Sequence, residues 1–227
     1  MPEFFRFPHT PHLAWLGNGL PRDDKVLGDA EVRALLGGRV LVEEKLDGAN
    51  IGLSLDEHGE IHVQNRGQYL EQPYLGQFSR LAAWLGQHGE ALQAHITADL
   101  IVFGEWCAAR HTLAYGGLPD WFLLFEVYSR ADKRFWSTAR RDSLASAIGL
   151  SVVPRVFEGV LSRNGAKDLL MRTTSAFGAD RVEGIVIRRE GTHWCESRAK
   201  LIRADFTQAI GDHWRTRRIE WNRQTGS

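Results

Sequence analysis

The chain has 227 residues, and its 28 lysines and arginines balance 28 aspartates and glutamates, so the formal net charge is zero. Its hydrophobic residues (43%) and aromatic residues (10%) are enough to bury a substantial core, which excludes global disorder. The length fits one large domain, and the neutral total argues against a protein that coats nucleic acid non-specifically.

The first half of the chain predicts an irregular lead-in over residues 1–39, then a meander and one helix. Hydrophobic periodicity and turn residues define these elements. They are a short helix near Asp29–Leu36, strands at Val40–Leu46, Ala49–Leu55 and Ile61–Asn65, and a helix over Gln77–His95.

The second half predicts more strands than helices, without a regular alternation of the two. The elements are strands at Leu100–Trp106 and Trp121–Tyr128, a helix at Ser137–Ile148, a strand at Val152–Phe157, a short helix at Lys167–Arg172, and strands at Val182–Arg188, His193–Ser197 and Arg198–Arg203. Pro154 assigns its strand to a sheet edge or a bulge. We therefore expect an α+β fold with two largely antiparallel sheets flanked by helices.

The sequence also indicates the cellular setting. It holds no apolar run of about 18 residues and no secretory signal at its start, so we expect no membrane association. Two cysteines, Cys107 and Cys195, are too few for a disulfide framework or a CxxC metal knuckle. We expect a soluble, cytoplasmic protein.

Lysine is scarce, because only five of the 28 basic residues are lysines. Lys45 stands at the end of a predicted strand, just before the turn Asp47-Gly48. A lysine amine can act as a nucleophile once it is deprotonated. The alternative is an ordinary hairpin with an exposed, inert lysine.

Five further motifs follow Glu43–Asn50 in order. They are Asn65-Arg66-Gly67, Phe103-Gly104-Glu105, Phe122–Glu126, Glu183–Arg188 and Lys200–Arg203. Over residues 40–206 the set resembles the covalent nucleotidyltransferase superfamily of ATP-dependent ligases and mRNA capping enzymes. Glu44, Asn50 and the interval from Lys200 to Phe206 make it most similar to ATP-dependent RNA ligases of the phage T4 RNA ligase 2 type.

The resemblance implies the chemistry of three residues. Lys45 corresponds to the nucleophile that attacks the α-phosphorus of ATP, expels pyrophosphate and forms lysyl–AMP. Lys200 corresponds to the lysine that contacts the α-phosphate and stabilises charge in the transition state. Glu183 corresponds to a carboxylate that binds the divalent cation, Mg²⁺ or Mn²⁺.

The same resemblance implies the residues that bind ATP or AMP. Glu44 matches a position that contacts adenine, and Asn50 belongs to the same motif. Arg66 matches an arginine on the nucleotide or the 5′-phosphate, or else is a solvated strand residue. Glu105 matches an acceptor for a ribose hydroxyl, or pairs with an arginine. Phe125 matches the aromatic residue that stacks on adenine, although its apolar run is equally suited to a core.

The last motif departs from the family. A second lysine is usual two residues after the first, and Ile202 occupies that position. We therefore assign Arg203 to ATP binding, which requires a bulge because alternate residues of a strand point to opposite faces. The alternative is that Arg198 replaces the missing lysine.

The C-terminal segment, residues 207–227, is basic. It carries Arg215, Arg217, Arg218 and Arg223, with Trp214 just before the first of them and Trp221 before the last. This composition is typical of a surface that follows a nucleic-acid strand, or of a solvated terminal helix with one apolar face. We expect residues 1–227 to form one adenylation domain without an appended oligonucleotide-binding fold.

The resemblance implies an ATP-dependent RNA ligase that joins RNA 3′-OH and 5′-phosphate ends. A partner protein would supply any further strand-binding surface. The alternatives are a DNA ligase or capping-type enzyme with the same core, and a non-catalytic nucleic-acid-binding module that kept the fold.

Overall fold

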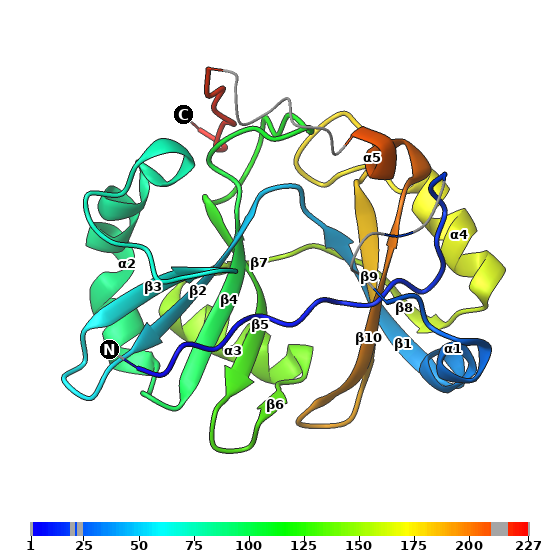
Figure 1. The fold of residues 1–227 in the computed structure, drawn as a ribbon, viewed down its shortest axis with the longest axis horizontal. Helices are drawn as coiled ribbons and strands as arrows, with labels where there is room; N and C mark the ends of the chain where they lie inside the picture. The colour runs from blue at the N-terminus through cyan, green and yellow to red at the C-terminus, as the bar shows by residue number, and fades with distance from the viewer. Residues whose placement is uncertain (1, 19–20, 22–24, 210–217, 227) are drawn as a thin grey trace.

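The computed structural model describes residues 2–18, 21, 25–209 and 218–226. Two sheets lie next to each other, and helices cover their outer faces (Figure 1). The α+β fold with two antiparallel sheets is confirmed; one short parallel pairing is the exception.

In the described part of the chain, the smaller sheet has four strands in the order β10-β9-β1-β8. Its elements and the helices that cover it are α1 (Asp29–Leu36), β1 (Arg39–Lys45), β8 (Arg155–Val160), α4 (Arg163–Arg172), β9 (Gly184–Glu190) and β10 (Cys195–Ile202). Val40 and Val42 of β1 point into a buried cluster with side chains of α1, α4, β9 and β10. That cluster buries the outer face of this sheet.

The larger sheet runs in the order β3-β2-β4-β5-β6, and β7 pairs with β5 in parallel. Its elements are β2 (Ala49–Leu55), β3 (Ile61–Asn65), a 3-10 turn (Gly76–Phe78), α2 (Leu81–His95), β4 (Leu100–Trp106), β5 (Phe122–Ser129), β6 (Arg134–Phe135), α3 (Thr138–Ile148) and β7 (Ser151–Val152). Side chains of α2 and α3 pack with β2–β5 in the largest buried cluster. A last helix, α5 (Ala204–Ala209), follows β10.

The N-terminal segment crosses both sheets (Figure 1). Phe5 stacks on Tyr128 with ring centroids 3.8 Å apart, and Phe7 contacts Phe103 of β4 at 4.9 Å. Farther along, the backbone N–H of Leu13 donates to the carbonyl of Lys200, and the Lys200 N–H donates to Pro11. The predicted irregular lead-in therefore joins the inner face of the larger sheet to the edge of the smaller one.

The predicted meander is wrong in one respect: β1 and β2 belong to different sheets. The Asp47-Gly48 step is a crossover between the sheets, so the hairpin alternative for Lys45 also fails. Backbone N–H groups of Thr112 and Leu113 donate to the Asp47 carboxylate at 2.7 and 2.8 Å. These bonds hold the crossover against a neighbouring loop. Gly48 also lies so close to the end of β4 that a Cβ there would be 2.6 Å from the Trp106 carbonyl.

Three other predicted elements differ from the structure. The strand at Val152–Phe157 is divided between β7 and β8, in different sheets, because Pro154 cannot donate a ladder hydrogen bond. Conversely, the two strands predicted over 193–203 are one strand, β10, with an irregularity after Cys195.

The described C-terminal residues are not a helix. Residues 218–224 form isolated bridges at Trp221 and Gln224, and a turn follows at 225–226. The Asn222 side chain bonds the backbone of Cys107 and Tyr115 at 2.8 and 2.9 Å. Trp221 packs against the largest buried cluster, where the Arg80 guanidinium lies 4.3 Å from its ring. The predicted Trp214, Arg215 and Arg217 lie outside the described residues. Within the described part, no helix is long and apolar enough to cross a membrane.

Candidate active site

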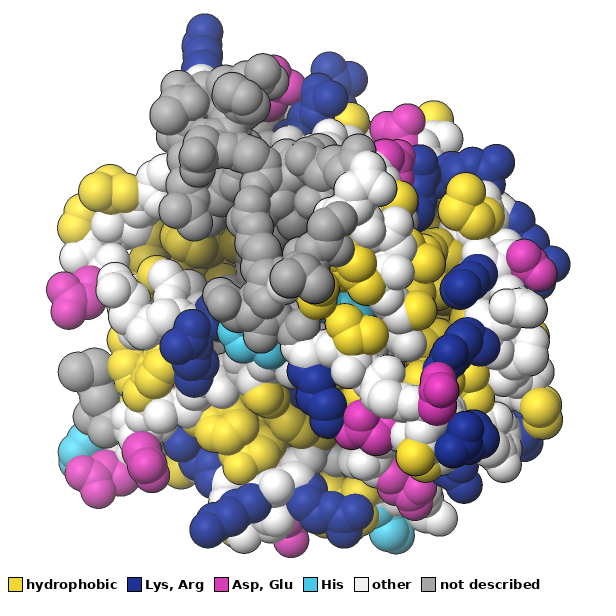
Figure 2. Space-filling model, turned by 45° about the vertical axis from the view of Figure 1, so that its right-hand side comes forward, with side chains coloured by type: hydrophobic (Ala, Val, Ile, Leu, Met, Phe, Trp, Pro, Cys, Tyr) yellow, Lys and Arg dark blue, Asp and Glu magenta, His cyan; other side chains and the backbone are white. Residues whose placement is uncertain are grey.

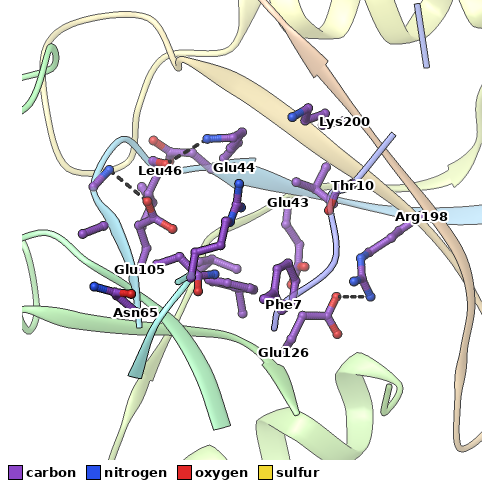
Figure 3. A pocket seen from close by; sticks show the side chains of 18 of the residues that line it. Phe7, Thr10, Glu43, Glu44, Leu46, Asn65, Glu105, Glu126, Arg198 and Lys200 are labelled. Carbon is purple, nitrogen blue, oxygen red and sulfur yellow. Dashed lines mark hydrogen bonds and ion pairs between the residues drawn. The ribbon is translucent and has the colours of Figure 1, made fainter. Parts of the chain in front are cut away.

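A cavity of about 540 Å³ lies between the two sheets (Figure 3). Its volume falls within the range of about 300–1,000 Å³ that is usual for small-molecule sites. Its lining includes eight of the residues discussed below: Glu44, Lys45, Asn50, Arg66, Glu105, Phe125, Arg198 and Lys200. The structure thus brings together motifs that are far apart in the sequence.

Lys45 ends β1 and lies opposite Gly184 of β9 in the ladder. Its amine is 2.8 Å from both carboxylate oxygens of Glu183, which directly precedes β9. Burial lowers the pKa of the Lys45 amine, but the charges of Glu183 and Glu105 outweigh it and raise that pKa to about 12. The free protein therefore holds Lys45 as a charged ammonium.

Glu105 adds a second carboxylate beside this lysine. It projects from β4 and accepts a hydrogen bond from the Gly48 N–H at 3.0 Å. Burial and the charges of Glu183 and Asp47 raise the pKa of Glu105, whereas the charge of Lys45 lowers that pKa. The raising effects are larger, so the pKa of Glu105 is about 7. Three acidic side chains thus act on one ammonium. Among the described residues they do not form a preformed set of metal ligands, because the group whose ligand atoms lie within 4.8 Å of one another is Asp56, Glu60 and His62. A carboxylate such as Glu183 is nevertheless the kind of hard oxygen ligand that Mg²⁺ or Mn²⁺ takes.

Two buried acceptors in the cavity lining have no donor in the structure: Oε1 of Glu44 and Oδ1 of Asn50. The other Glu44 oxygen accepts from the Ala176 N–H at 3.0 Å. An unsatisfied buried acceptor costs about 1–3 kcal/mol. A ligand that donates hydrogen bonds at these positions would recover that cost, so both atoms are candidate contacts for a polar heterocycle or sugar.

An aromatic wall closes one side of the cavity. Phe125 of β5 lines it and meets Phe7 edge-on at 5.4 Å; Phe7 also lines the cavity. Phe125 is therefore not confined to the core, and it offers a ring to a ligand. Phe7 was missed by sequence reasoning. The alternation of Phe5 and Phe7 was the signal available, but no motif placed that segment near β5.

Cations of β10 line the cavity next to Phe7, whose ring lies 5.1 Å from the Arg198 guanidinium. Arg198 and Lys200 are alternate residues of β10, so both face the cavity (Figure 3). Arg203 is not among the lining residues: it follows the end of β10, and its Nε lies 3.1 Å from the Asp205 carboxylate. The bulge that would turn Arg203 inward is absent from β10 at this point. The geometry therefore favours Arg198 as the second cation beside Lys200.

Arg66 reaches the cavity from the turn after β3. The preceding Asn65 shapes that turn, because its Oδ1 accepts from the N–H groups of Gly67 and Gln68 at 2.8 and 2.9 Å. The Arg66 side chain is exposed and can meet an anionic ligand at the cavity mouth.

A buried ion network spans the two sheets beside the cavity, and it was also missed from the sequence. Arg141 of α3 donates to Glu43 of β1 at 2.6 Å. Glu126 of β5 pairs with Arg188 of β9 and, at 3.1 Å, with Arg198 (Figure 3). Burial raises the pKa of Glu126, but Arg188 and Arg198 outweigh it and lower that pKa. Charged residues inside the otherwise apolar strands were the available signal.

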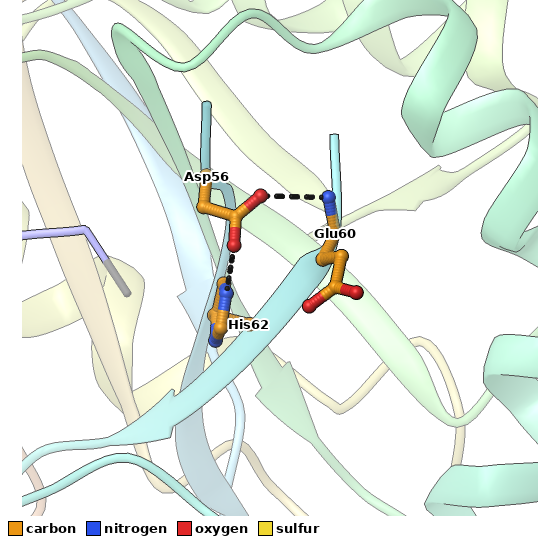
Figure 4. A group of neighbouring side chains, drawn as sticks. All are labelled: Asp56, Glu60 and His62. Carbon is orange, nitrogen blue, oxygen red and sulfur yellow. Dashed lines mark hydrogen bonds and ion pairs between the residues drawn. The ribbon is translucent and has the colours of Figure 1, made fainter. Parts of the chain in front are cut away.

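A second group of potential metal ligands lies on the β2–β3 turn, apart from the cavity (Figure 4). One Asp56 oxygen accepts from the N–H groups of His58 and Glu60, both at 2.9 Å. The other lies 2.9 Å from Nε2 of His62. These bonds close the hairpin turn, and they account for the grouping of Asp56, Glu60 and His62 without a ligand.

Comparisons with known proteins agree with this geometry. The model of the RNA ligase family matches residues 38–202. A comparison with curated proteins finds no match.

Similar solved structures include the Naegleria gruberi RNA ligase. A variant of it with ATP and Mn gives a TM-score of 0.65 at 18% identity, covering 92% of this chain and 59% of that chain. The same ligase with PPi gives 0.60 at 20% identity, covering 79% and 53%. The chain therefore spans less than two thirds of those proteins, and the likeness shows a shared fold.

Proposed function

The chain belongs to the RNA ligase family, and from that premise we propose that it is an ATP-dependent RNA ligase of the phage T4 RNA ligase 2 type. It would join RNA 3′-OH and 5′-phosphate ends through lysyl–AMP and RNA-adenylate intermediates. The observation that carries the proposal is the position of Lys45, whose amine contacts Glu183 at one end of a cavity that Arg198 and Lys200 line from β10.

In the first step, Nζ of Lys45 attacks the α-phosphorus of ATP. A P–N bond forms, the bond to the bridging oxygen breaks, and pyrophosphate leaves. The attack needs a neutral amine, whereas Glu183 and Glu105 hold the proton on Lys45 in the free protein. The Lys45–Glu183 pair must therefore be released when the nucleotide occupies the cavity, and the ammonium proton must pass to solvent or to a neighbouring carboxylate before the P–N bond forms.

The remaining lining residues would orient the nucleotide. The unpartnered oxygen of Glu44 would accept from the adenine amino group, with Asn50 as a further acceptor, and Phe125 would stack on the ring. Glu105 would accept from a ribose hydroxyl. This arrangement provides positioning and charge stabilisation, which are the main protein contributions to this kind of phosphoryl chemistry.

Arg66, Arg198 and Lys200 would bind the phosphates. Lys200 and Arg198 lie side by side on one face of β10 and would stabilise the charge that develops as pyrophosphate leaves. Glu183 would hold the divalent cation; when bound, that ion would shield the phosphates and support the leaving group.

A sealing assay tests the proposal. Nicked duplexes with RNA or DNA 3′-OH termini and single-stranded RNA ends are offered with ATP, and pre-adenylylated strands are offered without it. An RNA ligase seals RNA 3′-OH termini faster than DNA termini, and seals the pre-adenylylated strands without ATP. Preference for DNA termini would indicate a DNA ligase. Transfer of a nucleotide to RNA without sealing would indicate a capping-type enzyme.

A further inference from the structure

A surface patch of two arginines and two tryptophans lies outside the cavity. Arg134 belongs to β6, Trp136 follows it, Arg140 lies in α3, and Trp194 lies in the β9–β10 hairpin. We call these four residues the arginine–tryptophan patch. In Figure 1 the elements that form it meet along the lower edge of the molecule, where the two sheets approach each other.

The four side chains are stacked in alternation. The Arg140 guanidinium lies 4.0 Å from the Trp136 ring and 4.8 Å from the Trp194 ring, and that of Arg134 lies 4.9 Å from Trp194. Trp136 and Trp194 also pair through their backbones, and the Ser137 N–H donates to His193 at 3.0 Å. The rings are therefore fixed, and stacking orders the guanidinium planes. Nη1 of Arg140 donates to the carbonyl of His193 at 3.4 Å, and the remaining edges of the two guanidinium groups stay available to accepting oxygens.

No carboxylate among the described residues neutralises Arg134 or Arg140. Nearby Asp132 accepts from the Ser129 hydroxyl at 2.7 Å, and Glu190 is paired with Arg188 at 2.6 Å. Elsewhere the pattern is different. Basic and acidic side chains are interspersed on the face in Figure 2, and arginines such as Arg163 are paired, here with Asp29 at 2.7 Å. The patch thus combines unpaired positive charge with aromatic surface.

The patch lies next to the wall of the cavity, at the edge strand β6. Phe135 lies between Arg134 and Trp136 in the chain, and its ring is 4.1 Å from the guanidinium of Arg198, which lines the cavity. The carbonyl of Trp136 accepts from Arg188, another lining residue, at 3.3 Å. Because alternate residues of an extended segment point to opposite faces, a strand that leaves the cavity would pass over the edge at β6 to reach the patch.

We propose that the arginine–tryptophan patch binds the phosphate backbone of the RNA strand whose end is being joined. This inference rests on the proposed ligase function. Phosphate oxygens match the free edges of the two guanidinium groups, and arginines interleaved with aromatic rings are typical of surfaces that follow single strands. The seam between the sheets is thus a candidate strand-binding surface in addition to the one predicted for the C-terminal segment.

The test compares Arg134→Ala/Arg140→Ala with the parent protein in two assays. The first is covalent labelling by ATP, which the variant should retain at the parental rate because it leaves the cavity intact. The second is binding of a single-stranded 5′-phosphorylated RNA at several salt concentrations. Loss of two phosphate contacts should weaken binding roughly 25-fold at about 0.1 M salt and reduce the salt slope by about 1.4.

The matched control is Arg33→Ala/Arg172→Ala, which removes the same charge from exposed positions on α1 and α4. It should leave the affinity and the salt slope within about twofold of the parent, since surface arginines remote from the strand release no counterions. If the alanine pair fails to fold, Arg134→Gln/Arg140→Gln keeps the side-chain volume and tests the same contacts.

Parental RNA affinity and salt slope in the folded patch variant would overturn the inference, as would an equal loss in the control. These outcomes are distinct from failure of the proposed function, which would appear as a parent protein that takes no label from ATP.

Discussion

Arg141→Met should destabilise the protein strongly, because Arg141 holds a buried carboxylate of the other sheet. Its guanidinium donates to Glu43 at 2.6 Å, to Asp142 and to the carbonyl of Phe125 at 2.9 Å, and its side chain is only 2% exposed. Removing Arg141 leaves Glu43 with only the more distant Arg188, whose Nε is 3.8 Å away. Loss of one partner of a buried pair costs about 3–5 kcal/mol. For a chain of this length, Tm should fall by roughly 6–20 °C.

The assay is urea unfolding followed by fluorescence, with two matched variants. Arg155→Met removes an exposed arginine that is 3.1 Å from Glu158, and should cost less than about 1 kcal/mol. Glu43→Leu/Arg141→Met removes both buried charges and should recover most of the loss. Equal effects of Arg141→Met and Arg155→Met would refute the reasoning, as would a double variant that is no more stable than the single one.

The pH dependence of the stability lost in Arg141→Met is an independent test, because its direction follows from the pKa of Glu43. Burial raises the pKa of Glu43, and Arg141 opposes that rise. Arg141→Met should therefore raise the pKa of Glu43 further above its unfolded value. A carboxyl group with a raised folded-state pKa binds more protons when folded, so its penalty is absent at low pH and grows as pH rises through that pKa. The deficit of the variant should be larger at pH 8 than at pH 5, and a deficit that grew toward low pH would contradict this sign.

Three further predictions concern the cavity. Arg198→Ala should slow covalent labelling by ATP roughly 100-fold, as expected for loss of a phosphate contact, whereas Arg203→Ala should change it less than about threefold. Glu44→Ala should lose discrimination between ATP and a purine triphosphate without the amino group, with KM for ATP rising about 10- to 100-fold; unchanged discrimination would remove Glu44 from the adenine site. Gly48→Ala should slow labelling roughly 100-fold, because its Cβ would lie 2.6 Å from the Trp106 carbonyl; a parental rate would show that the crossover tolerates displacement.

Local sequence patterns predicted most elements well, because strand and turn signals are local. The bounds of β2, β3 and β4 match the predicted ranges. Sheet membership was harder to predict, because an apolar run before Asp47-Gly48 reads like any hairpin strand. Long-range contacts place the chain in the other sheet: the bonds of the Asp47 carboxylate with the N–H groups of residues 112 and 113, and the pairing of β2 with β4. The short β7 and β8 were merged for the same reason, since the partners of each are distant in sequence.

The site residues also divide into those that local motifs predict and those that depend on contacts distant in sequence. The motif residues that gather around the cavity were identifiable because each follows a recognisable local sequence. Phe7 and Arg141 were not, since their roles come from contacts with β5 and β1 that no local pattern encodes. Arg203 shows the reverse case: strand periodicity alone indicated that it points away from Lys200, and the structure places it beside Asp205, outside the cavity lining.

The most direct test of the central claim is the covalent state of Lys45 after incubation with ATP and Mg²⁺. Intact mass measurement and peptide mapping should find one AMP on Lys45, released by pyrophosphate. Lys45→Ala should remain unmodified, and Lys167→Ala, which removes a lysine of α4 outside the cavity lining, should label like the parent. AMP on another residue, or a parent protein that stays unmodified with ATP and either Mg²⁺ or Mn²⁺, would contradict the account.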